Sequence, residues 1–223
     1  MKSYAFVLKP SKIHYEFSIR SKLNVLQVLL GITQYLLVTD GPQSLPDDKW
    51  EPEPNKIRLI LYIDKMSRIF IYERDKIHSF YFPFSLRIID EKCTLWGKNE
   101  CQITNATCAV LESLFSRISE NDTVENILDE YWSIAADFNL SKEDAEQYSN
   151  LIIQLLSFEP GYLRFDHDTE HPDVDNHPQD HFDINYTDGA SFKFGLYSSL
   201  DDIAFIDVLK SNTPCFFLSP KKR

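Results

Sequence analysis

Glycine is scarce in this chain, which has only six glycines among 223 residues. They form neither the GxGxxG fingerprint of dinucleotide-binding folds nor the GxxxxGK[ST] loop of P-loop NTPases. The GxSxG pattern that positions the nucleophile of α/β-hydrolases is missing as well. These absences argue against three large classes of enzyme.

Sequence signals for structural zinc and for membranes are also missing. No HExxH pattern occurs, and the four cysteines are not spaced as CxxC pairs: they are Cys93, Cys101, Cys108 and Cys215. The longest apolar stretch, residues 23–38, is interrupted by polar side chains and is shorter than the ~18 residues of a membrane span. The apolar start of the chain is too short for a secretory signal. We therefore expect a cytoplasmic protein with reduced thiols and no membrane contact.

Residues 165–188 contain no positively charged Lys or Arg side chain. The net charge of the chain is −11, and residues 165–188 hold seven Asp, one Glu and four of the six His, without a single Lys or Arg. A broad non-specific nucleic-acid surface needs Lys and Arg, so we expect nucleic acid only as a substrate. An acidic segment of this kind can bind cations, meet a basic protein partner or remain a solvated loop.

The remaining sequence is typical of a globular protein, with 43% hydrophobic residues. Alternating polar and apolar residues predict strands, and apolar residues spaced by three or four predict helices. The predicted strands cover residues 4–8, 57–63, 68–72, 78–89, 93–96, 162–167, 181–186 and 191–196. Helices are predicted after Ser21, over 104–118 and 124–131, after Ser141, and after Ser198 or Ser199. Residues 40–55, with four prolines, are predicted as a loop.

These elements fall into three regions that we expect to form one compact unit. Residues 1–100 form an N-terminal mixed α/β region with an antiparallel sheet, residues 101–160 a helical cluster, and residues 161–223 a β-rich region with the acidic His/Asp loop. The predicted fold class is therefore α+β, with antiparallel sheet regions, a central helical cluster and a C-terminal three-stranded sheet plus helix.

Period-two alternation on the three C-terminal strands separates an apolar face from a polar face. The polar face gathers a candidate catalytic set: Arg164, Asp166, His181, Asp183 and Lys193, with Asn185 and Ser191 beside it. His181 would act as general acid or base, Asp183 would orient it, and Arg164 with Lys193 would hold a phosphate group. This set predicts a phosphoester-cleaving effector of RNase or nuclease type.

The same residues allow two other interpretations. His177, His181 and Asp183, with Asp166 on the neighbouring strand, could ligate Mn²⁺, Fe²⁺ or Mg²⁺, so a divalent metal is a candidate cofactor. Alternatively, the polar face is the solvated side of a half-exposed antiparallel sheet. His14 and His78 are interpreted as structural.

The C-terminal third, with YLRFDHD followed by HPQDHFDINY, resembles an uncharacterised prokaryotic family. Members of that family carry an aromatic-Arg-aromatic-Asp strand, an acidic loop and an HPxxHxxxN segment. Here these features fall on Arg164, Asp166, His177, Pro178, His181 and Asn185. Genes for such proteins often lie beside mobile elements and phage-defence or toxin–antitoxin loci. The resemblance implies a bacterial subunit of such a complex, which works with a protein partner that the acidic loop would dock.

Overall fold

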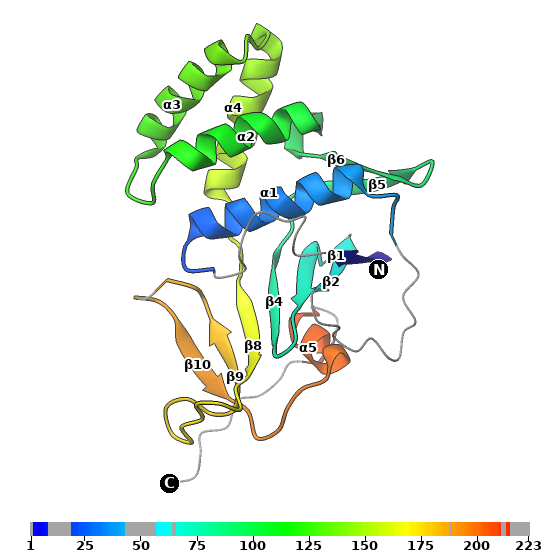
Figure 1. Ribbon diagram of the computed structural model, residues 1–223, viewed down its shortest axis with the longest axis vertical. Helices are drawn as coiled ribbons and strands as arrows, with labels where there is room; N and C mark the ends of the chain where they lie inside the picture. Colours follow the sequence, from blue (N-terminus) through cyan, green and yellow to red (C-terminus); the bar gives the residue numbers. More distant parts are fainter. Residues whose placement is uncertain are drawn as a thin grey trace.

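The structure is a computed structural model that describes residues 2–8, 19–42, 57–63, 66–187, 189–210 and 213–214. Within these residues the chain forms five α-helices and ten strands in two antiparallel sheets (Figure 1), which confirms the predicted α+β class. Most of the predicted loop at residues 40–55 lies outside the described residues.

The larger sheet has seven strands in the order β1-β2-β3-β4-β8-β9-β10. Their bounds are Lys2–Leu8, Ile57–Ile63, Arg68–Tyr72, Lys76–Tyr81, Leu163–His167, Asp180–Ile184 and Phe192–Gly195. The three C-terminal strands therefore extend the N-terminal sheet, because β8 pairs with β4 in antiparallel register. The smaller sheet consists of β5 (Ser85–Ile89), β6 (Lys92–Trp96) and β7 (Gln102–Ile103).

The helices begin where the sequence offers side-chain caps. Their bounds are Lys22–Val38 for α1, Asn105–Arg117 for α2, Val124–Asp137 for α3, Lys142–Ser157 for α4 and Asp202–Leu209 for α5. The predicted caps Ser21 and Ser141 each accept a backbone N–H three residues on. The prediction for α5 was wrong: its cap is Asp201, whose carboxylate accepts the N–H of Ala204 at 2.8 Å, and neither Ser198 nor Ser199 takes this role.

The seven-stranded sheet is covered differently on its two faces. Over β1–β4, one face packs under α1 as part of the main core, which continues into the smaller sheet and the α2–α4 cluster. The opposite face packs against Phe205 and Ile206 of α5, through Phe70, Ile77, Phe165 and Phe182. This second core explains why β3 reads as an almost continuous apolar run, because both of its faces are buried.

The polar face of β8–β10 continues the sheet face that α1 covers over β1–β4. Phe165 pairs with Ile77 on the α5 side, so Arg164 and its partner His78 lie on the α1 side. Residue 20 directly precedes α1, and its backbone N–H donates to the side chain of Asn24. In Figure 1 the N-terminal end of α1 lies near the upper ends of β8–β10.

A glycine directs the chain from α4 into β8. Gly161 has φ +52°, in the left-handed region that glycine occupies most readily. Its carbonyl accepts a hydrogen bond from Arg68 at 2.5 Å, and its N–H donates to Glu159. This turn fixes the position of Tyr162 at the start of β8. Among the described residues, no helix combines the length and apolar character needed to cross a membrane.

Candidate functional site

The register of the C-terminal strands brings the predicted polar set together. Arg164 lies opposite Asp183, Asp166 lies opposite His181, and Lys193 lies opposite Asp183 on the other side of β9. Alternation alone placed these side chains on one face, and the pairing now makes them direct neighbours.

Two cations and two carboxylates form the centre of the cluster. The Arg164 guanidinium donates two hydrogen bonds to Asp166, at 2.5 and 2.6 Å, and a third to Asp183. Lys193 Nζ donates to the other Asp183 oxygen at 2.5 Å. Burial alone would raise the pKa of Asp183, but the Lys193 hydrogen bond and the Arg164 charge outweigh it and lower this pKa below its ordinary value. Asp183 is therefore a firmly ionised carboxylate.

His181 lies behind this pair and has no exposed surface. Its Nδ1 is 2.7 Å from the Pro178 carbonyl, which can only accept, so Nδ1 carries the proton and Nε2 accepts from Lys193 at 2.9 Å. Burial, together with the Lys193 charge, lowers the pKa of His181 and keeps the ring neutral. His181 thus holds Lys193 in place and is not among the residues that line the cavity described below, which does not favour its predicted role as general acid or base.

The segment that holds His181 packs closely against β10. A side chain at Gly195 would place its Cβ 2.7 Å from Cγ of Pro178, which is closer than real Cβ contacts. Only glycine allows Pro178 to lie there, and the Pro178 carbonyl orients the His181 ring. The predicted HPxxH segment thus acts through backbone packing as well as through its side chains.

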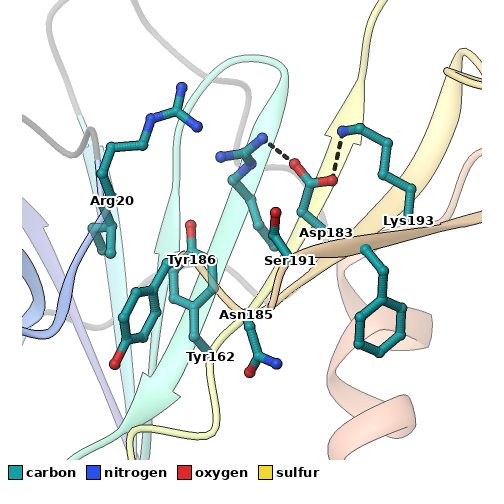
Figure 2. Close-up of a pocket in the computed structure, with 10 residues that line it drawn as sticks. Arg20, Tyr162, Asp183, Asn185, Tyr186, Ser191 and Lys193 are labelled. Carbon is teal, nitrogen blue, oxygen red and sulfur yellow. Dashed lines mark hydrogen bonds and ion pairs between the residues drawn. The ribbon is translucent and has the colours of Figure 1, made fainter. Parts of the chain in front are cut away.

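A cavity of about 190 Å³ opens beside the cluster, at the end of β9 that is nearest to α1. Its polar lining consists of Arg20, Tyr162, Arg164, Asp183, Asn185, Tyr186, Ser191 and Lys193. Figure 2 shows Lys193 and Asp183 in contact on one side and Arg20 reaching in from the other. Three cations and one carboxylate line the cavity. Arg164 and Lys193 are already paired with Asp166 and Asp183, so the excess positive charge comes from Arg20, and it would favour an anionic ligand.

Sequence reasoning missed Arg20, Tyr162 and Tyr186. Tyr162 and Tyr186 form an edge-to-face pair with ring centroids 5.7 Å apart. Tyr162 shares the phase of Arg164 and Asp166 in the predicted strand, but as an aromatic residue it was not counted in the polar set. Nothing in the sequence links residue 20 to strands that follow some 140 residues later. The predicted cap at Ser21 indicates only that Arg20, the residue before it, lies at the start of a helix.

Three of the four predicted metal ligands lie together. Ligand atoms of Asp166, His181 and Asp183 all lie within 4.8 Å of one another. However, the Lys193 ammonium lies between His181 and Asp183, and Arg164 binds both carboxylates. A metal would have to displace these cations.

The predicted metal ligand His177 lies beside this trio and outside it. Its ring is edge-on to that of His181, with centroids 4.5 Å apart, but its Nδ1 faces Asp168 at 3.8 Å. The chemistry of the donor set alone fits a divalent ion, whereas the two cations already satisfy its negative charge.

The acidic loop between β8 and β9 holds itself together. Asp168 accepts the N–H groups of His171 and Glu170, and Asp173 accepts from Asn176 and Asp175. These hydrogen bonds lower the pKa of both carboxyls. Residues 169–176 are all exposed, and His171 contributes no side chain to the cavity.

Comparison with known proteins gives no further guidance. No protein-family model matches the chain, and no similar curated protein or solved structure was found.

Proposed function

We propose that the chain is a phosphoester-cleaving effector, RNase-like or nuclease-like, whose substrate phosphate enters the cavity beside β8–β10. The observation that carries this proposal is the convergence of Arg20, Arg164 and Lys193 on one small cavity. Guanidinium groups donate to phosphate oxygens in pairs, and an ammonium adds a point charge. Tyr162 and Tyr186 offer aromatic rings on which an unpaired base can stack.

The net negative charge of the chain does not prevent a phosphate substrate from binding at the cavity. Asp166 and Asp183 are neutralised by Arg164 and Lys193, and Asp180 faces His167 at 2.7 Å. The exposed acids of residues 169–176 lie in the loop that precedes β9 (Figure 1). The cavity lies at the other end of this strand, because Asn185 and Tyr186, which follow β9, line it. A substrate can therefore approach the cations without crossing the acidic loop.

Replacing Lys193 by methionine tests this proposal, because it removes the charge and keeps the aliphatic stem. We expect cleavage of a mixed-sequence, fluorophore-quencher-labelled single-stranded RNA to fall by about 10- to 100-fold, which corresponds to about 1.4–2.7 kcal/mol. Lys142→Met is the matched control, because the Lys142 side chain is 91% exposed on α4. Equal cleavage by wild type and Lys193→Met would contradict the proposal.

A second candidate function is docking of a protein partner, as expected of a subunit in a phage-defence or toxin–antitoxin complex. The specific observation is Val174, which is 79% exposed within the exposed acidic loop. An apolar side chain surrounded by fixed negative charge suits a partner with a basic rim and a small apolar pocket.

The double variant Glu170→Gln and Asp175→Asn tests docking and keeps Asp173 and Asp180, which stabilise the loop. Association with a protein encoded beside this chain should slow several-fold at low salt, and the difference should vanish at high salt because exposed charges are screened beyond about 8–10 Å. Glu143→Gln with Glu146→Gln on α4 is the control. Association rates that do not change in the double variant would exclude the loop as the docking surface.

A further inference from the structure

A second hydrogen-bonded chain leads from the cavity into the sheet. The Tyr162 hydroxyl lies 3.0 Å from Nδ1 of His78 on β4, and Nε2 of His78 lies 3.3 Å from a Glu73 oxygen. His78 is 2% exposed and Tyr162 3% exposed, so the chain is shielded from solvent up to Glu73. Carboxylate, imidazole and hydroxyl thus lie in a row that ends at the cavity wall.

The direction of the protons follows from what each group can donate. An ionised Glu73 only accepts, so the proton of a neutral His78 lies on Nε2 and its Nδ1 is an acceptor. The Tyr162 hydroxyl therefore donates to His78. Its oxygen is left to accept a further proton, and the positive charge of Arg164 lies near it.

Tyr162 by itself is a poor base. Burial raises its pKa to about 12, although Arg164 opposes this rise. Transfer of its proton to His78 while the oxygen receives another proton avoids a free phenolate. The partner of His78 on β8 is Arg164, whose charge Asp166 and Asp183 neutralise.

We infer that Tyr162 is the proton-transferring residue of the site and that His78 and Glu73 are the positioning residues that make it a base. This inference rests on the proposed function and narrows the substrate class to phosphoesters with a neighbouring hydroxyl, as in single-stranded RNA. The base is thus a different residue from the predicted His181, and His78, which the sequence indicates as structural, takes part in the chemistry.

The proposed step is an attack of the 2′-hydroxyl of the substrate on the neighbouring phosphodiester. The 2′-oxygen of the substrate forms a bond to phosphorus while its proton moves to the Tyr162 oxygen, and the Tyr162 proton moves to Nδ1 of His78. The bond from phosphorus to the 5′-oxygen breaks, and the electron pair leaves with that oxygen. The leaving oxygen takes a proton from water, and the proton held on His78 neutralises the hydroxide that remains. The products are a 2′,3′-cyclic phosphate and a 5′-hydroxyl.

Two variants separate proton transfer from simple packing. Tyr162→Phe removes only the hydroxyl, and His78→Asn keeps a hydrogen-bonding group near Nδ1 that cannot take a proton. With the labelled RNA, we expect kcat to fall by about 100-fold or more in both variants, and KM to change by no more than about 3-fold. Tyr197→Phe, at a residue that is 95% exposed, is the matched control. RNA with 2′-O-methyl groups should not be cleaved.

Nitrogen NMR of histidine-labelled wild-type protein checks the same arrangement without activity. We expect neutral His78 with its proton on Nε2, and a proton on Nδ1 would overturn the inference even if the variants fail to fold. Undiminished kcat in folded Tyr162→Phe would overturn the inference and leave the proposed function standing. Absence of RNA cleavage by the wild type would overturn both.

Discussion

Replacing Arg164 by alanine should lower the free energy of unfolding by about 3–5 kcal/mol at neutral pH. The Arg164 guanidinium binds Asp166 and Asp183, whose side chains are only 8% and 13% exposed. Without it, Asp166 loses its bidentate partner and two poorly hydrated carboxylates face each other across the strands. The cost is that of buried unpaired charge, which greatly exceeds the value of an exposed ion pair.

Urea unfolding of wild type and variant measures this loss. The control is Arg117→Ala, because Arg117 pairs with Glu130 at 2.9 Å at the surface, with its side chain 44% exposed. We expect that control to cost less than about 1 kcal/mol. A loss of similar size in both variants would show that the Arg164 cluster behaves as an ordinary surface network.

The loss should also depend on pH. The pKa of Asp183 is lowered in the folded chain, so its stabilising effect is present above the unfolded value of about 3.9 and disappears as pH falls through the folded value. Once the carboxyls that Arg164 contacts are protonated, they are neutral, and the loss of Arg164 leaves no buried unpaired charge. The difference between wild type and Arg164→Ala should therefore shrink below about pH 4.

Replacing Phe205 by alanine should cost a similar amount, about 3–5 kcal/mol, for an apolar reason. Phe205 has no exposed surface, and its ring lies 5.9 Å from that of Phe70, 6.4 Å from Phe165 and 5.8 Å from Phe182. It is the central side chain of the core between α5 and the sheet. The cavity left behind would loosen the apolar side of the strands whose polar side carries the site.

Thermal or urea unfolding measures this effect, with Ile203→Ala on the same helix as the control. Ile203 is 68% exposed, so its loss should change stability by no more than about 0.5 kcal/mol. If Phe205→Ala were as mild as Ile203→Ala, the packing of α5 would contribute little to the fold.

The parts of this structure that depend on local alternation could be predicted from the sequence. Arg164, Asp166, Asp183 and Lys193 share one face because side chains in a strand alternate, whatever the strand pairs with. The burial of His181 could not be predicted in this way, because it depends on Lys193 from β10 and on the loop at Pro178.

The pairing of β4 with β8 could not be predicted either, because no local pattern specifies a partner strand so far along the chain. His78 was therefore interpreted as structural, although the register places it beside Arg164 and within reach of Tyr162. The position of the predicted ligand His177 could not be predicted for a related reason: it follows the loop geometry, which places its Nδ1 toward Asp168. The expected partner and cellular location stay predictions.

The β4–β8 pairing also determines when the site can form during synthesis. Residues 82–162, which contain the smaller sheet and helices α2–α4, separate the two strands in the chain. Until β8 leaves the ribosome, β4 has an unpaired edge, and such edges attract other strands. His78 then lacks Tyr162, and Arg20 has no cavity to line. A truncated or stalled chain would thus expose the unpaired edge of β4, which can pair with strands of other chains, and it would lack the site. The pairing of β8 with β4 therefore links folding to function.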